Sequence, residues 1–145
     1  MPAYLLDTNH LIALLNRVPV AVEKQQQLEE TGSRVCSTAI SLGELYFGAF
    51  HSRHRSRNLR RLSRLRRRFV FLPFDERAAI EYGRIREETH SRGTPIPVAD
   101  TMIAAIARPP RLRVLSHDEH FRWVPGLQVE DWLARNRLAP PMPLG

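Results

Sequence analysis

Four acidic side chains stand at the borders of apolar segments, where a carboxylate can take part in chemistry. Asp7 ends the short apolar run 3–6, and a helical pattern begins directly after it. Three more acids occupy similar junctions: Glu44, Asp100 and Asp118. Carboxylate oxygens are hard ligands that suit Mg²⁺ or Mn²⁺ better than zinc. A cation held in this way can activate water and offset charge on a phosphate, so the residue types point to phosphodiester hydrolysis.

Each acid, taken singly, also has a structural interpretation. Asp7 and Asp118 are suitable N-caps for the turns that follow them. Glu44 follows Ser41 by three residues, which is the spacing of a capping box, so its side chain could bond the Ser41 amide. Asp100 stands in a first helical turn, where the helix dipole favours a carboxylate. Four carboxylates at close quarters would raise one another's pKa values, and a divalent cation would relieve that repulsion.

The elements that must position these acids alternate between strand-like and helix-like patterns. We expect strands at 3–6, 34–38, 69–74 and 112–115, with a short edge strand at 127–129. We expect helices at 10–16, 20–31, 39–50, 53–68, 75–92 and 98–107, and a brief one around 131–135. This alternation is typical of an α/β fold with a parallel sheet and helices on both faces. In such a sheet all four acids can project into the crevice at the carboxyl ends of the strands.

Length and composition indicate one globular domain. The chain has 145 residues, enough for a single core, and we expect one domain over 1–135. The proline-rich tail at 136–145 is expected to be disordered. No apolar stretch approaches the roughly 18 residues that a membrane span needs. Cys36 is the single cysteine, so no internal disulfide is possible and a reducing cytoplasm is the expected location.

The positive charge of the chain is concentrated in one segment. The formal net charge is +7, and nine arginines lie within 53–68, a stretch without any acid. Outside that stretch 13 basic residues face 15 acids, a net charge of −2. Local basicity of this kind favours a surface that meets a polyanion. A solvated helix face is the alternative, and a GC-rich genome would also favour arginine over lysine.

Four segments, in order and spacing, carry a family resemblance. They are Asp7-Thr8-Asn9; 37–45 with Gly48; 95–100; and 115–118 with Phe121 and 124–127. Together they resemble the PIN-domain ribonucleases and, more narrowly, the VapC toxins of bacterial toxin–antitoxin pairs. The resemblance runs from about Tyr4 to Trp132, nearly the whole chain.

The resemblance implies both a fold and an activity. The fold would be an α/β/α sandwich around a parallel sheet of about five strands. The activity would be Mg²⁺- or Mn²⁺-dependent endoribonuclease cleavage of structured RNA such as tRNA, leaving 5′-phosphate and 3′-hydroxyl ends. The partners would be a second copy of the chain and a cognate VapB-like antitoxin that blocks the site.

The resemblance also assigns roles to individual residues. Asp7, Glu44 and Asp100 would be the core metal ligands and Asp118 the fourth acid. Thr8 and Asn9 would hold Asp7 by hydrogen bonds, and Ser116 would support the site. The candidates for contact with RNA or with the antitoxin are Arg53, Arg57, Arg60, Arg61, Arg64 and Arg67.

The histidines are interpreted differently. His51, His54, His117 and His120 could suggest zinc, but no cysteine lies near them in the sequence, and we expect surface histidines. His117 departs from the family pattern, which often has asparagine at this position.

Two other functional classes are weighed against the nuclease. A phosphatase with Asp7 as nucleophile would need an acid two residues later, where Asn9 stands. A receiver domain would need a lysine late in the chain, but the only lysine is Lys24. The remaining alternative is a non-catalytic module that binds RNA or an antitoxin and uses its metal only for structure. Metal-dependent RNA cleavage would distinguish the enzyme from this module.

Overall fold

The computed structural model describes residues 3–133 and residue 144 of the chain. At its centre is a five-stranded sheet in the order β3-β2-β1-β4-β5, in which all neighbours run parallel. The strands are β1 (Ala3–Leu6), β2 (Arg34–Thr38), β3 (Val70–Leu72), β4 (Arg113–Leu115) and β5 (Val129–Glu130). The predicted α/β class with about five parallel strands is confirmed.

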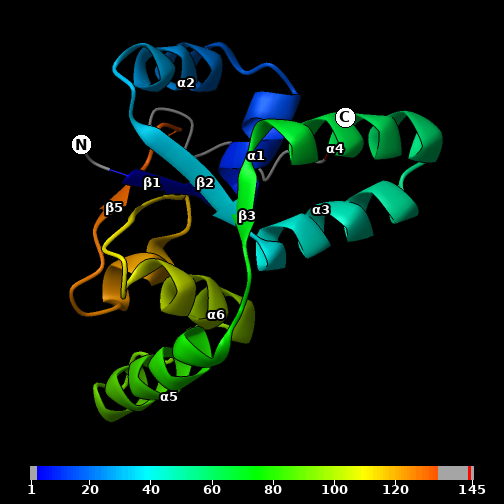
Figure 1. Cartoon of the computed structure of the whole chain (residues 1–145). Helices are drawn as coiled ribbons and strands as arrows, with labels where there is room; N and C mark the ends of the chain where they lie inside the picture. Colours follow the sequence, from blue (N-terminus) through cyan, green and yellow to red (C-terminus); the bar gives the residue numbers. More distant parts are fainter. Residues whose placement is uncertain (1–2, 134–143, 145) are drawn as a thin grey trace.

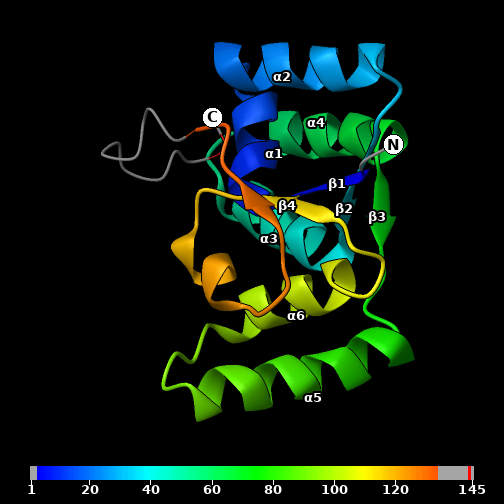
Figure 2. The same ribbon diagram turned by 90° about the vertical axis from the view of Figure 1, so that its left-hand side faces the viewer.

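Helices cover both faces of this sheet. They are α1 (Thr8–Leu15), α2 (Pro19–Glu30), α3 (Ala39–His51), α4 (Arg55–Arg68), α5 (Glu76–Ser91) and α6 (Val98–Ala107), with the 3₁₀ helix η1 (Glu119–Trp123). α1, α2 and α4 lie on one side of the sheet and α5 and α6 on the other, as Figures 1 and 2 show. α3 runs beside α4 (Figure 1). Within the described residues, no helix is both long and apolar enough to cross a membrane.

The central strand β1 is buried on both faces, which explains its uninterrupted apolar run. Tyr4 and Leu6 join a core with α1, α3 and α4, whereas Leu5 joins a second core with α5 and α6. This division follows from the two-residue period of a strand. On α4, Leu62 and Leu65 are buried beneath the arginines, so a narrow apolar stripe attaches this basic helix to the core.

Local capping sets where several elements begin and end. The Ser41 amide donates to Thr38 Oγ1 at 3.1 Å, which caps α3. The Ala78 amide donates to Asp75 Oδ1 at 2.9 Å, which caps the start of α5. β3 is shorter than the predicted 69–74 because Phe69 still closes α4 through the Leu65 carbonyl.

The end of the chain is only partly described. The helix expected around 131–135 extends beyond residue 133, and the tail at 136–145, apart from residue 144, lies outside the described residues. The single-domain boundary at 135 stays a prediction.

Candidate active site

The four predicted acids come from four different segments and meet at the carboxyl edge of the sheet. Asp7 follows β1 and Asp118 lies three residues after β4. β1 and β4 are neighbours at the point where the strand order reverses, which is where ligands bind in open parallel sheets. Glu44 lies on α3 and Asp100 in the first turn of α6. The charges of Glu44 and Asp118 raise the pKa of Asp7, so these carboxylates are electrostatic neighbours.

Asp7 is the most deeply placed of the four, with 5% of its surface exposed. Burial raises its pKa to about 6, against the lowering effects of hydrogen bonds from Ser116 and the Thr8 backbone. The Ser116 hydroxyl donates to Asp7 Oδ2 at 2.7 Å. A buried carboxylate that few donors compensate is a costly arrangement unless a cation joins it.

Asp100 is perturbed in the same direction. Burial, followed by the negative charges of Asp118 and Asp7, raises its pKa to about 7. A shared hydrogen bond with Asp118 raises the pKa further, and a hydrogen bond with His120 lowers it. Two neighbouring carboxyl groups with pKa values near neutrality are a frequent sign of a functional site.

Glu44 is exposed, and its hydrogen-bond partner is not the Ser41 amide that a capping box would require. The Thr8 hydroxyl donates to Glu44 Oε1 at 3.0 Å. The Ser41 amide is taken by Thr38, so the capping-box interpretation of Glu44 is wrong. The glutamate instead lies above the first turn of α1, beside the strand end that carries Asp7.

The predicted supporting residues Thr8, Asn9 and Ser116 each form hydrogen bonds near the acids, but not all of them bond Asp7. Ser116 donates to Asp7 and also accepts from the Asp118 amide at 2.9 Å, so it ties two of the acids together. Thr8 bonds Asp7 through its backbone and Glu44 through its hydroxyl. Asn9 accepts from the His117 amide at 3.2 Å, which joins the ends of β1 and β4. Thr8 therefore bonds Asp7, as expected, through its backbone. The Asn9 side chain accepts from His117 instead, and the side-chain donor to Asp7 is Ser116.

One residue of the site was missed in the sequence. His120 Nδ1 lies 2.8 Å from Asp118 Oδ1 and 3.3 Å from Asp100 Oδ2, so this partly exposed histidine also contacts two of the acids. The ligand atoms of Asp100, Asp118 and His120 all lie within 4.8 Å of one another. The available signal was the two-residue spacing from Asp118, since a capped turn folds the side chain back over its cap.

Two further histidines support the strand ends behind the site. His117 Nδ1 lies 2.9 Å from Asp131 Oδ2, so it too is not merely a surface residue. His10 is fully buried, and its Nε2 accepts from the Trp132 amide at 3.0 Å. Burial lowers the pKa of His10 to about 4, against the opposing charge of Asp131. These contacts fasten the segment after β5 to α1.

The arginines of α4 are exposed, with one exception among the predicted contacts. Arg61 is half-buried; it donates to the Leu15 carbonyl and, at 3.2 Å, to Asn16 Oδ1. It also donates to Asn58 Oδ1 at 3.0 Å. The guanidinium therefore closes the carboxyl end of α1, and its role is structural in addition to any contact with a partner. The exposed candidates are Arg53, Arg57, Arg60, Arg64 and Arg67.

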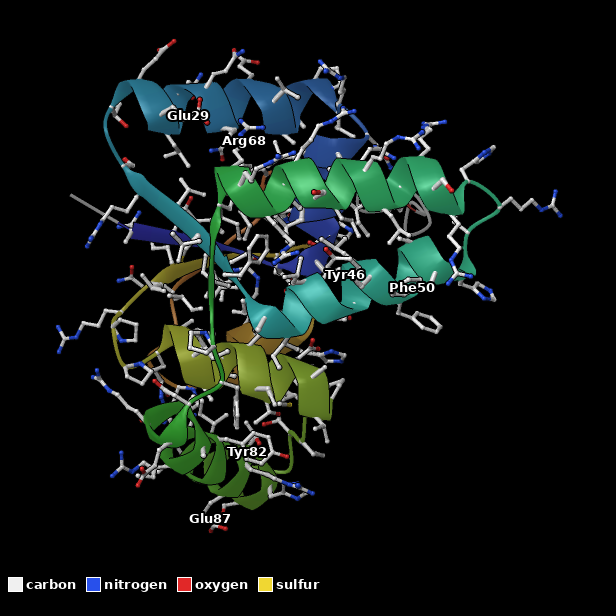
Figure 3. All side chains as sticks on the ribbon, turned by 45° about the vertical axis from the view of Figure 1, so that its right-hand side comes forward. Glu29, Tyr46, Phe50, Arg68, Tyr82 and Glu87 are labelled. Atoms are coloured by element: carbon white, nitrogen blue, oxygen red, sulfur yellow. The ribbon has the colours of Figure 1, made fainter. Side chains whose placement is uncertain are left out.

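A groove of about 610 Å³ runs between α2 and α4. Apolar side chains from α1, α2 and α4 line it together with arginines. Arg68 donates to Glu29 Oε1 at 3.0 Å, and Figure 3 shows the two residues pointing toward one another from the two helices. The lining residues are Leu14, Leu15, Arg17, Val22, Gln26, Glu29, Arg57, Arg60, Arg61, Arg64, Leu65 and Arg68.

The residues at the carboxyl edge fit a divalent cation. Four carboxylates supply hard oxygen donors, which suits Mg²⁺ or Mn²⁺. The raised pKa values of Asp7 and Asp100 show that negative charge there lacks compensation from the protein. A divalent cation would supply that compensation.

The chain is similar to known proteins. Residues 4–127 match the family model of the PIN domain. The tRNA(fMet)-specific endonuclease VapC of Salmonella typhimurium is 35% identical over 91% of this chain and 99% of its own length. Ribonuclease VapC2 of Haemophilus influenzae is 30% identical over 92% of this chain and 100% of its own.

The fold of this chain is also similar to solved structures. DNA-bound VapBC from Salmonella typhimurium contains a chain that matches with a TM-score of 0.82 at 34% identity, over 91% of this chain and 99% of that one. VapBC-1 from nontypeable Haemophilus influenzae gives a TM-score of 0.80 at 30% identity, over 90% and 98%. With the match to the family model and the acids at the sheet edge, these likenesses show that the chain belongs to the PIN-domain family and, within it, to the VapC ribonucleases.

Proposed function

We propose that this ribonuclease is the toxin of a toxin–antitoxin pair and that it hydrolyses RNA with Mg²⁺ or Mn²⁺ as cofactor. One observation carries the proposal. Four carboxylates from separate segments converge where the strand order reverses, and the pKa values of two are raised to about 6 and about 7. Such a cluster is unfavourable alone and favourable around a cation.

The residues of the chain would divide the work as follows. Asp7, Glu44, Asp100 and Asp118 would hold the ion. When bound, such an ion activates water and offsets the charge that develops on the phosphate. Ser116 keeps Asp7 and Asp118 in a fixed relation, because it donates to one and accepts from the backbone of the other. Thr8 orients Glu44 from the opposite side.

Structured RNA such as tRNA is the proposed substrate. One relative at 35% identity is a tRNA(fMet)-specific endonuclease. The exposed arginines of α4 would add phosphate contacts without taking part in the chemistry. The chain would act as a homodimer, which is supported by the exposed apolar side chains Phe47 and Phe50 on α3 and Val98 on α6, 71%, 51% and 56% exposed.

A VapB-like antitoxin is the proposed inhibitor, and the groove between α2 and α4 is its proposed seat. Related chains have been crystallised as VapBC complexes. An apolar floor beneath a rim of arginines suits an amphipathic segment with acidic residues on one side. Sedimentation analysis of the toxin mixed with antitoxin would test the seat. Arg57→Glu with Arg64→Glu should abolish complex formation, whereas Arg77→Glu with Arg84→Glu on α5 should leave it intact. Equal loss in both pairs would contradict the seat.

Cleavage of total tRNA by purified protein tests the activity. We expect discrete fragments with Mg²⁺ or Mn²⁺, none with EDTA, and a loss of at least about 100-fold in Asp7→Asn and Asp100→Asn. Glu87→Gln is the matched control, since Glu87 is an exposed acid on α5 (Figure 3) and is not one of the four clustered acids. Equal cleavage by all variants would place the activity elsewhere. No cleavage by folded, metal-loaded, antitoxin-free protein would favour the non-catalytic binding module.

A further inference from the structure

We propose that His120 is a direct ligand of the metal ion and gives this site a preference for Mn²⁺ over Mg²⁺. The inference rests on the proposed function, because it assumes that a cation binds among the carboxylates. It goes further by adding a nitrogen donor to an oxygen site and by ranking the two candidate ions.

The imidazole ring of His120 lies beside two of the four acids. His120 Nδ1 lies 2.8 Å from Asp118 Oδ1 and 3.3 Å from Asp100 Oδ2. The three side chains offer ligand atoms that all fall within 4.8 Å of one another. A cation seated between the two carboxylates would therefore meet the imidazole nitrogen without any movement of the backbone.

The local fold holds the ring in this position. The His120 amide donates to Asp118 Oδ1 at 2.9 Å, which closes the first turn of η1 and brings the side chain back over its cap. The Trp123 ring packs edge-on against the imidazole, with centroids 5.1 Å apart and planes at 65°. The residue is half-exposed, so an ion can approach from the solvent side.

The chemistry of the donor decides between the ions. Mg²⁺ strongly prefers oxygen ligands and gives up its water reluctantly. Imidazole suits transition metals such as Zn, Fe and Ni. Mn²⁺ suits carboxylates and is the transition-metal ion of the two candidates. The mixed set therefore favours Mn²⁺.

The competing role for His120 is positional. Its ring could donate a hydrogen bond to Asp118 and orient that carboxylate without touching the ion, as many residues around metal sites do. Both roles predict weaker metal binding when the ring is removed. Only direct ligation places a ¹⁴N nucleus next to the electron spin of Mn²⁺.

Pulsed electron paramagnetic resonance of the Mn²⁺-loaded protein separates the two roles. We expect ¹⁴N coupling in wild type, replaced by the ¹⁵N pattern when the histidines are ¹⁵N-labelled. The coupling should vanish in His120→Ala and in His120→Gln, which keeps an N–H donor for Asp118. It should persist in His90→Ala, a control exposed in the last turn of α5. Circular dichroism would check that each variant is folded.

Affinity gives a second readout that does not depend on cleavage. His120→Ala should weaken Mn²⁺ binding by about tenfold and Mg²⁺ binding by less than about twofold, measured by calorimetry. Tightly bound Mn²⁺ without nitrogen coupling in wild type would overturn the inference and leave the proposed function standing. Coupling that survives in folded His120→Ala would also overturn it. Failure of folded wild type to bind Mn²⁺ at all would overturn both the inference and the proposed metal dependence.

Discussion

At the scale of single residues, the site concentrates more negative charge than its hydrogen bonds compensate. Asp7 receives donors from Ser116 and from the Thr8 backbone, yet burial still raises its pKa to about 6. The pKa of Asp100 is raised further, to about 7, by burial and by the charges of the neighbouring carboxylates. The same groups that prepare the site for a cation therefore oppose folding when no cation is bound.

Asp7→Asn should stabilise the metal-free protein. The folded pKa of Asp7 lies above the unfolded value of 3.8, so the cost of its charge grows as pH rises from about 4 to about 6. At pH 8 the variant should gain up to about 3 kcal/mol in free energy of unfolding, measured with urea in EDTA. The gain should disappear below pH 4, and Glu87→Gln should show none. A loss of stability at pH 8 would contradict this account of Asp7.

Metal binding should weaken in acid. Protons compete with the ion for Asp7 and Asp100, whose pKa values are about 6 and about 7. Between pH 7 and pH 6 the affinity for Mn²⁺ should fall about tenfold, and above pH 7.5 it should level off. Calorimetry in buffers of different ionisation enthalpy would count the released protons. An affinity that is constant from pH 6 to pH 8 would contradict the raised pKa values.

His10 should make the fold less stable as pH falls, whereas Asp7 makes the metal-free fold less stable as pH rises. Its folded pKa of about 4 lies below the unfolded value of 6.5, so stability is complete above pH 6.5 and is lost as pH falls toward 4. Protonation also removes the Nε2 lone pair that accepts the Trp132 amide. The stability difference between wild type and His10→Asn should shrink by about 3 kcal/mol between pH 7 and pH 4. Urea titrations would measure it, with His90→Asn as an exposed control that shows no such change.

At the scale of elements, α1 is the helix that joins the site to the groove. Its first turn carries Thr8 beside Asp7, and its last turn ends where Arg61 of α4 donates to the Leu15 carbonyl. The neighbouring loop contributes Asn16, which accepts from the same guanidinium. One helix thus links the acidic edge of the sheet to the arginine-lined groove.

Arg61→Ala should destabilise the fold, whereas Arg60→Ala should have little effect on stability. Removing the guanidinium leaves the Leu15 carbonyl and Asn58 Oδ1 without this partner, which should cost about 1–3 kcal/mol in free energy of unfolding. Arg60→Ala is the matched control, since Arg60 is exposed one residue earlier and should change stability by less than about 0.5 kcal/mol. Equal effects in urea denaturation would refute the structural role of Arg61.

At the scale of the whole molecule, positive and negative charge are separated. Nine arginines lie within 53–68, on and just before α4, whereas four carboxylates lie together at the end of the sheet. A polyanion would therefore be attracted to one side of the molecule and presented to acids that need a cation to receive it.

Neutralising the exposed arginines should reduce RNA affinity and its dependence on salt. With Asp100→Asn to prevent cleavage, the change of Arg60, Arg64 and Arg67 to Gln should lower the logarithmic salt slope by about 2. The same change at Arg77, Arg84 and Arg92, which are exposed on or beside α5, should alter the slope by less than about 0.7. Fluorescence anisotropy across a salt series would measure both, and equal slopes would argue that α4 does not face RNA.

Much of the fold could be predicted because the signals are local. The strands at 3–6 and 34–38 and the helix at 98–107 have the predicted bounds, since apolar runs and caps act over a few residues. The parallel direction of the strands follows from their alternation with helices along the chain. Asp7, Glu44, Asp100 and Asp118 could be named because each stands at a junction that a parallel sheet brings to one edge.

The elements, the fold class and the four acids could be predicted from the sequence, because they depend on short-range patterns and on the alternation of strands with helices. The hydrogen-bond donors of each acid could not be predicted, because they depend on tertiary contacts. Ser116 rather than Asn9 bonds Asp7, His120 leans over Asp100 and Asp118, and Arg61 closes α1 across 46 positions of sequence. Those contacts depend on side-chain direction between segments that are distant in the chain, and no local preference encodes that direction.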